Sequence, residues 1–154
     1  MTSQSASFSQ RFRFSDWPNS EIPLVAAGVY AIWENETLIY CGMSGRGIDS
    51  RNSESKKRGG LVTRLASHAS GRLSGDQFCV YVANRLVIPK LTLEQLPLFA
   101  EDELRLDHLT KEYIHEKLEY QFELVESGED AFELEERCRR GEIFGVRPFL
   151  NPAD

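Results

Sequence analysis

The chain has 154 residues, of which 41% are hydrophobic, and it carries a formal net charge of −6 at pH 7. This length is enough for one hydrophobic core, and the lack of any run of about 18 apolar residues argues against a membrane-spanning helix. Three cysteines without metal-binding spacing, and an N-terminus without the basic flank and apolar run of a secretory signal, favour a cytoplasmic protein with free thiols.

The pattern of the first 24 residues predicts an N-terminal tail with an added strand, which precedes the main domain. Apolar and polar side chains alternate from Phe8 to Phe14, which is typical of a strand. The stretch from Ser15 to Asn19 contains Asp, Pro and Asn, and it predicts a turn or the start of a short helix. We therefore place the main domain at residues 25–154.

Two short runs rich in β-branched and aromatic residues flank Glu34-Asn35-Glu36 and predict a hairpin over about 25–42. If the turn centres on Asn35, Tyr30 lies opposite Tyr40 or one position off. Side chains paired in this way have Cβ atoms roughly 5 Å apart, so two phenols would stand side by side on a rigid ribbon. A two-stranded core element with tyrosines at its rim would give the same pattern.

A polar segment over residues 44–60 predicts a loop, and a helix is expected to follow it as far as about residue 69. In that helix Arg64 and His68 are four residues apart and share a face. Between residues 44 and 72, seven basic residues oppose two acidic ones, which leaves a local net charge of +5. The loop is either a solvated linker or a phosphate-contacting segment. In the second case the candidate substrate-binding residues are Arg46, Lys56, Lys57 and Arg58.

The next stretch alternates between predicted strands and helices. Residues 77–87 are rich in β-branched and aromatic side chains and predict a strand. Helices are expected over 92–99 and 104–118. Alternation of apolar and polar side chains over 120–125 then predicts another strand.

A further helix is expected over 128–141, because acidic residues open the segment and basic residues precede a closing glycine. Its apolar stripe consists of Ala131, Leu134 and Cys138. Glu135 flanks this stripe, whereas Glu133 and Glu136 lie farther from it on the helix and are expected to face water.

Taken in order, these elements resemble the GIY-YIG nuclease superfamily. The two tripeptides that name the family lie on adjacent strands, and here they read Gly28-Val-Tyr30 and Tyr40-Cys-Gly42. The family's next motif is an arginine followed four residues later by a histidine, which Arg64 and His68 match. Family members then carry a metal-binding glutamate on a later helix, often as Ala-x-x-Leu-Glu, and Glu135 ends such a string.

The resemblance implies an α+β fold with a small central, mainly antiparallel sheet of three or more strands flanked by helices. Near the end of the chain, Pro148 to Asn151 resembles the family's Pro-x-x-Asn, whose asparagine helps to hold the site together. Gly28 and Gly42, as parts of the tripeptides, would support the site structurally. The segment at about 77–117 is longer than the minimal family core needs and would contain an inserted element.

The implied activity is metal-dependent hydrolysis of phosphodiester bonds, an endonuclease reaction on nucleic acid with one divalent cation, Mg²⁺ or Mn²⁺. Glu135 would be the metal ligand, and Arg64 would clamp a phosphate oxygen. Tyr30 would act as general base, Tyr40 would orient the phosphate or assist proton transfer, and His68 would hydrogen-bond Tyr30 or relay its proton. DNA is the first expectation for the substrate, although the residues distinguish neither DNA from RNA nor which group takes the first proton.

The acidic balance of the chain supports a second hypothesis. Acidic residues crowd the stretch from Glu94 to Glu136, whereas nucleic-acid footprints are usually basic. A catalytically silent module of the same fold would bind nucleic acid, or a protein partner through the acidic surface, without turnover. The presence of all five candidate catalytic residues favours the nuclease.

Overall fold

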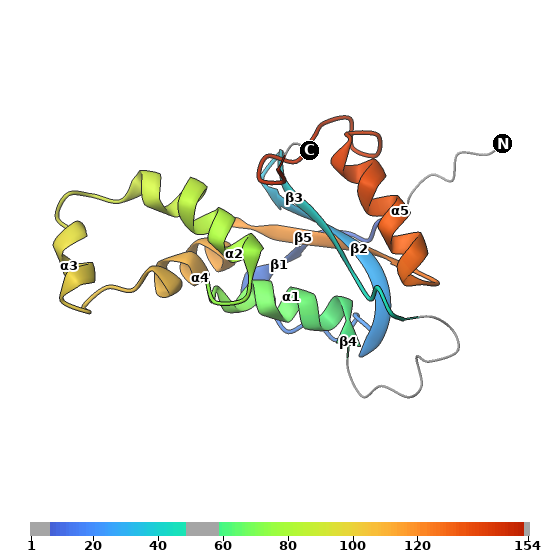
Figure 1. Cartoon of the computed structure of the whole chain (residues 1–154), viewed down its shortest axis with the longest axis horizontal. Coiled ribbons are helices and arrows are strands. Elements are labelled where there is room, and N and C mark those ends of the chain that lie inside the picture. The colour runs from blue at the N-terminus through green and yellow to red at the C-terminus, as the bar shows by residue number, and fades with distance from the viewer. Residues whose placement is uncertain (1–6, 49–58, 153–154) are drawn as a thin grey trace.

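The computed structural model describes residues 7–48 and 59–152 and shows a central sheet with helices on both faces (Figure 1). The strand order is β1-β5-β2-β3, and the short β4 pairs with β2 off this path. Pairs along the path are antiparallel, whereas β4 runs parallel to β2. This arrangement confirms the predicted α+β class. The strands are β1 Phe12–Arg13, β2 Val25–Glu34, β3 Thr37–Ser44, β4 Gly59–Gly60 and β5 Glu119–Val125.

Helices α1 and α5 lie on opposite faces of this sheet, and the segment from α2 to α4 projects away from it as a helical arm, residues 77–117 (Figure 1). Over the described ranges, no helix combines the length and the apolar character needed to cross a membrane. The helices are η1 Phe14–Asp16, α1 Leu61–Ser70, α2 Gln77–Val82, η3 Ala83–Val87, η4 Ile88–Lys90, α3 Leu96–Ala100, α4 Leu106–Lys117 and α5 Gly128–Arg139.

Strand β2 is buried along most of its length because helices cover both of its faces. Side chains alternate across a strand, so Tyr30 and Ile32 join the core that includes α1, α2 and α4, while Val29 and Ala31 join a smaller core under α5. The predicted apolar stripe of α5, Ala131 together with Leu134 and Cys138, packs in the smaller core. All three cysteines are buried with free thiols, which agrees with the predicted free thiols, and all three belong to the core.

The predicted hairpin forms, but its register differs from the expected one. Its two-residue turn contains Asn35 at φ 53°, a left-handed conformation that asparagine tolerates. An irregularity in the ladder beyond the turn then shifts the pairing, so that Tyr30 lies opposite Gly42 and Tyr40 opposite Ile32. The two tyrosines are therefore diagonal neighbours rather than direct partners.

Residues 77–87 are helical, and the prediction of a strand there was wrong. Asp76 caps α2, because its carboxylate accepts a hydrogen bond from the N–H of Cys79 at 3.0 Å. Phe78, Cys79 and Val82 are buried at helical spacing. The β-branched and aromatic composition misled the prediction, since burial of one helical face overrides strand propensity in this context.

Two other predicted elements are shorter than expected. The strand over 8–14 is reduced to β1, although the N–H of Ser9 still donates to the carbonyl of Phe122 at 2.8 Å. The helix over 92–99 is reduced to α3. The helix over 104–118 and the strand over 120–125 are confirmed as α4 and β5.

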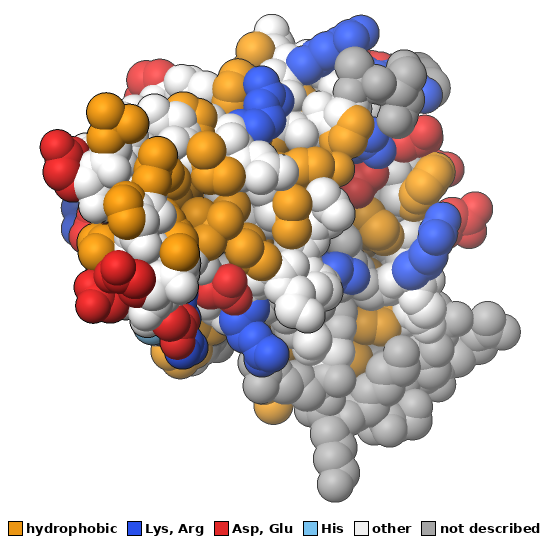
Figure 2. Space-filling model, turned by 60° about the vertical axis from the view of Figure 1, so that its left-hand side comes forward, with side chains coloured by type: hydrophobic (Ala, Val, Ile, Leu, Met, Phe, Trp, Pro, Cys, Tyr) orange, Lys and Arg blue, Asp and Glu red, His pale blue; other side chains and the backbone are white. Residues whose placement is uncertain are grey.

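The outer end of the helical arm exposes apolar side chains. Figure 2, which brings this end forward, shows them gathered there beside acidic side chains. Ile88, Leu93 and Leu96 are exposed large hydrophobic residues of this segment. The arm thus differs from β2, whose apolar side chains are largely buried.

Candidate active site

Tyr30 and Tyr40 face the same side of the sheet, toward α1, and their ring centroids are 6.3 Å apart. Tyr30 is 2% exposed, whereas Tyr40 is half-buried. Gly42 makes this arrangement possible, because a Cβ at that position would lie 2.3 Å from the Tyr30 hydroxyl oxygen. The Tyr30 ring can therefore lie across β3 only where β3 has no side chain.

A hydrogen-bonded chain leads from Tyr30 into the protein. The Tyr30 hydroxyl lies 2.7 Å from Nε2 of His68, and Nδ1 of His68 lies 2.7 Å from Oδ2 of Asp76. An ionised carboxylate can only accept hydrogen bonds, so Nδ1 of His68 carries the proton and donates a hydrogen bond to Asp76. Nε2 then accepts a hydrogen bond from the Tyr30 hydroxyl. Burial lowers the pKa of His68, although the bond to Asp76 opposes this, and the imidazole is neutral in this tautomer.

Asp76 is the member of this chain that the sequence did not predict as a site residue. Burial disfavours its charge, but hydrogen bonds from His68, from the Ser67 hydroxyl at 2.6 Å and from the N–H of Cys79 outweigh that effect and lower its pKa to about 2. The predicted strand over 77–87 hid this residue. If the sequence is interpreted with Asp76 as the N-cap of a helix, Asp76 lies beside the end of α1, where His68 is located.

Arg64 lies one turn before His68 on α1, and its side chain is exposed. Its guanidinium makes no ion pair or hydrogen bond with another residue of the described ranges. Its positive charge nevertheless reaches both tyrosines and lowers their pKa values. Burial outweighs this effect of Arg64. It raises the pKa of Tyr30 well above its ordinary value, and burial together with the charge of Glu135 raises the pKa of Tyr40 to about 12.

Glu135 approaches the site from α5, on the other face of the sheet. Its neighbours Ala131 and Leu134 anchor that face of the helix in the smaller core, so Glu135 flanks β3. Its side chain is 17% exposed, and Oε1 lies 3.7 Å from Nη1 of Arg139. Burial raises the pKa of the carboxyl group, while Arg139 and Arg46 lower it. Its charge raises the pKa of both tyrosines, which makes Glu135 the candidate carboxylate for this site.

The other acidic residues of α5 point elsewhere. Glu133 is exposed, as predicted from its helical phase. Glu136 has a side chain 42% exposed and pairs with Arg140 at 3.7 Å. Among the three glutamates, Glu135 is therefore the least exposed, and its charge is the one that acts on both tyrosines.

Asn151 fastens the C-terminal tail, residues 147–152, to the outer edge of β3. Its side-chain oxygen accepts from the N–H of Cys41 at 2.8 Å, and its amide nitrogen donates to the carbonyl of Cys41 at 2.9 Å. The N–H groups of Phe149 and Leu150 donate to carbonyls of β3 at 3.0 and 2.8 Å. The tail thus extends the sheet edge next to Tyr40.

The remaining predicted residues divide into those that the structure describes and those that it does not. A Cβ on Gly28 would lie 2.9 Å from the Glu123 carbonyl oxygen and 3.0 Å from Leu61, so glycine permits the close packing of α1 on the sheet. Arg46 is exposed, with its guanidinium carbon 5.6 Å from the centroid of the Phe132 ring. The predicted substrate-binding residues Lys56, Lys57 and Arg58 lie outside the described ranges.

The donor set suits a hard cation that keeps much of its water. Within the described ranges, no group of three or more His, Cys, Asp or Glu side chains could hold a metal. A cation at this site would have Glu135 as its only carboxylate ligand and water for most other positions, which Mg²⁺ accepts and Zn²⁺ seldom does. The half-buried, raised-pKa carboxyl group of Glu135 fits that role, because a nearby cation would favour its charged form.

Hydrogen bonds thus join Tyr30, His68 and Asp76, and the ring of Tyr40 lies beside that of Tyr30. The charges of Arg64 and Glu135 act on both tyrosines. The chain's similarity to a nuclease family rests on these motif residues and their order, and membership stays a prediction. In comparisons with protein-family models, with curated proteins and with solved structures, nothing matches this chain.

Proposed function

We propose that this protein is a metal-dependent endonuclease that hydrolyses phosphodiester bonds of nucleic acid. The observation that carries the proposal is the hydrogen-bonded chain Tyr30–His68–Asp76, with Tyr40, Arg64 and Glu135 grouped at its outer end. Such a chain is a preformed path for a proton, and the charges beside it suit a phosphate and a cation. DNA is the first candidate substrate.

The chain's own residues accept the proton that the attacking water loses. The water oxygen forms a bond to phosphorus and gives one proton to the Tyr30 oxygen, while the phenolic proton passes to Nε2 of His68. Asp76 stabilises the imidazolium that results, since its carboxylate already accepts from Nδ1. The bond from phosphorus to the leaving oxygen breaks, and that oxygen takes a proton from solvent.

The raised pKa of Tyr30 explains why this relay is needed. A buried phenol keeps its proton at neutral pH, so Tyr30 can accept a proton from water only as it releases its own to His68. Arg64 binds the phosphate oxygens and stabilises the charge that develops on them. Tyr40, half-buried beside Tyr30, orients the phosphate. A divalent cation held by Glu135 would neutralise phosphate charge and acidify a bound water.

The ion pair between Glu135 and Arg139 favours a second candidate, a nucleic-acid-binding module without turnover. In that case Arg139 would occupy the carboxylate that a cation needs, and the five residues would serve structure and binding alone. The two candidates differ in one measurable property, which is cleavage that depends on a divalent cation and on Glu135.

The test is cleavage of labelled DNA and RNA, single- and double-stranded, with Mg²⁺, with Mn²⁺ and with EDTA. We expect cleavage with either cation and none with EDTA. Glu135→Gln, which is nearly isosteric, should abolish cleavage with little loss of stability, and Glu133→Gln on the exposed face of the same helix is the matched control. Cleavage by Glu135→Gln at the wild-type rate, or no cleavage of any substrate by the wild type, would reject the proposal.

A further inference from the structure

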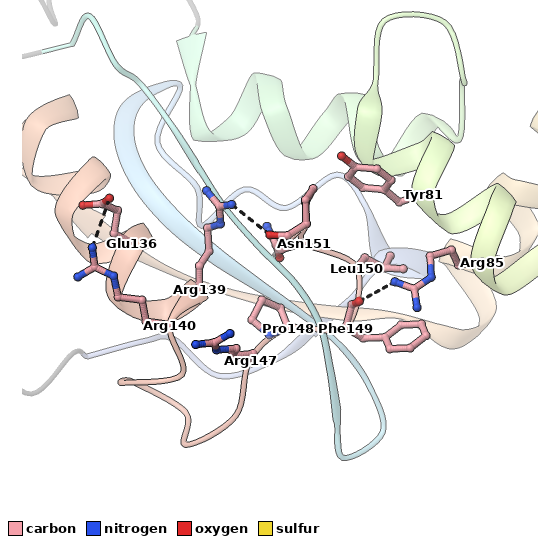
Figure 3. Close-up of a pocket in the computed structure, with 11 residues that line it drawn as sticks. Tyr81, Arg85, Glu136, Arg139, Arg140, Arg147, Pro148, Phe149, Leu150 and Asn151 are labelled. Carbon is pink, nitrogen blue, oxygen red and sulfur yellow. Dashed lines mark hydrogen bonds and ion pairs between the residues drawn. The ribbon is translucent and has the colours of Figure 1, made fainter. Parts of the chain in front are cut away.

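A groove of about 950 Å³ opens beside the candidate active site (Figure 3). Its floor is the C-terminal tail that extends the edge of β3. One wall is the end of α5 with Arg139 and Arg140, and the other is α2 and η3 with Tyr81 and Arg85. The groove therefore follows the sheet edge between the two helical layers.

The lining is basic although the chain as a whole is acidic. Four arginines and one glutamate, Glu136, line the groove, in a chain of net charge −6. Arg147 is exposed and makes no ion pair with any residue of the described ranges. Arg140 shares its charge with Glu136 at 3.7 Å and with Glu142 at 3.9 Å. A concentration of arginine on an acidic protein marks a place that receives anions.

The groove also presents an aromatic face. Phe149 is 45% exposed, and the guanidinium carbon of Arg85 lies 4.0 Å from the centroid of its ring. The same guanidinium donates to the Phe149 carbonyl at 2.8 Å, so the ring and the charge are held together. A fixed aromatic ring beside an arginine is the arrangement on which unpaired bases stack.

Contacts connect this groove directly to the candidate active site. The rings of Tyr81 in the groove and Tyr40 in the site have centroids 6.4 Å apart. Arg139 contacts Glu135 at 3.7 Å, and it also lies 3.5 Å from the carbonyl oxygen of Pro152 in the tail. A strand lying in the groove would therefore reach the tyrosines without leaving the surface.

We propose that this groove binds an unpaired segment of a nucleic-acid strand, flanking the bond that is cut. Arg147 and Arg140 contact its phosphates, and Phe149, backed by Arg85, stacks against a base. The inference deepens the proposed nuclease function and rests on it for the identity of the strand, but binding itself is measurable without hydrolysis. The phosphates of a duplex can also contact the arginines, but its bases are stacked and paired and therefore cannot stack on Phe149.

The test is binding of fluorescent oligonucleotides, in EDTA to prevent cleavage, by fluorescence anisotropy over a range of salt concentrations. The oligonucleotides are single-stranded, fully duplex, and duplex with a single-stranded flank. Arg147→Gln should lower the salt slope for the single strand by about 0.7, the value for one phosphate contact. Phe149→Leu keeps an apolar side chain and the backbone bonds of the tail, and it should weaken single-strand binding about fivefold or more. Arg13→Gln, an exposed arginine on the opposite edge strand β1, is the control and should change neither.

The outcomes separate this inference from the nuclease proposal. Cleavage by the wild type together with unchanged binding by Arg147→Gln and Phe149→Leu would overturn the groove and leave the nuclease standing. Weakened binding in both variants without any cleavage by the wild type would support the groove and overturn the nuclease. An equal loss of duplex and single-strand affinity in Phe149→Leu would overturn the assignment to an unpaired strand, and so would a wild type that binds no oligonucleotide. Thermal unfolding of each variant confirms that the tail remains folded.

Discussion

The candidate site has two halves that differ in how their polar groups are satisfied. In the buried half, Tyr30, His68 and Asp76 form one hydrogen-bonded chain, and none of them is more than 3% exposed. In the open half, Arg64 is exposed, and Glu135 keeps a side chain 17% exposed beside Arg139. The buried half is complete without a ligand, whereas the open half presents charges that a ligand would satisfy.

This difference gives the two halves different physical tasks. Burial keeps His68 neutral and Tyr30 protonated, so in the proposed mechanism the buried half would fix the direction of proton transfer before substrate arrives. The open half carries the charges that would contact phosphate and cation in that mechanism. Substitutions in the buried half should therefore change both stability and rate, while substitutions in the open half should change rate alone.

After the loss of cleavage expected for Glu135→Gln, the largest effect should come from Tyr30. Tyr30→Phe removes the proposed acceptor of the water proton and should slow single-turnover cleavage by about 10²–10⁴-fold. It also leaves Nε2 of His68 buried without a donor, which should cost about 1–3 kcal/mol of unfolding free energy in urea titrations. Tyr40→Phe should lose less rate and little stability. If Tyr40→Phe were the slower variant, the two tyrosines would exchange roles.

Arg64 tests the open half. Arg64→Ala should slow cleavage by about 10²–10³-fold, the usual effect of losing one oriented donor in the transition state. Arg64→Lys should not restore the rate, because an ammonium group cannot reproduce the planar fork of a guanidinium. Both variants should unfold at the wild-type urea concentration, since the side chain is exposed. A rate for Arg64→Ala within about threefold of wild type would contradict its role on that scale.

Asp76 tests whether the buried half acts as a unit. Asp76→Asn should slow cleavage by roughly 10–100-fold, because it no longer fixes the tautomer of His68. The folded-state pKa of Asp76, about 2, lies below its ordinary value, so the ionised group stabilises the fold above about pH 4 and that contribution is lost as the pH falls toward 2. The wild type should therefore lose about 2 kcal/mol more unfolding free energy than Asp76→Asn over this interval. Parallel pH profiles for the two proteins would show that these hydrogen bonds do not hold Asp76 in its ionised form.

The same comparison shows what the sequence could predict. Spacing alone placed Arg64 and His68 on one face of α1, and helical phase separated Glu135 from Glu133, because both follow from the helical repeat. Direct pairing of Tyr30 with Tyr40, one of the two predicted registers, likewise placed both side chains on one face. The observed register differs from it by two residues, and a shift of two keeps a side chain on its face.

The parts that could not be predicted depend on long-range packing. Asp76 reaches His68 only because 77–87 folds as a helix, and the β-branched composition of that stretch favoured a strand. The groove needs the tail to pair with β3 and Arg85 to project from η3, two features that no local pattern encodes. The sequence placed positive charge in the loop over 44–60, whereas the described arginines of the groove come from distant segments.

The smallest effect on chemistry should come from that loop, which shows whether substrate affinity resides there or in the groove. Changing Lys56, Lys57 and Arg58 together to Gln should leave the single-turnover rate at saturating substrate nearly unchanged. If these side chains bind phosphates, the slope of log affinity against log salt for duplex DNA should fall by up to about three, near one for each phosphate that is no longer neutralised. Phosphate contacts position the substrate without reading its sequence, so affinity should fall uniformly across sequences.

The charge-matched control changes the exposed Arg13, Lys111 and Lys117 to Gln and should leave the slope unchanged. An unchanged slope in the loop variant would show that the loop is a solvated linker, and a collapsed single-turnover rate would place it in the active site.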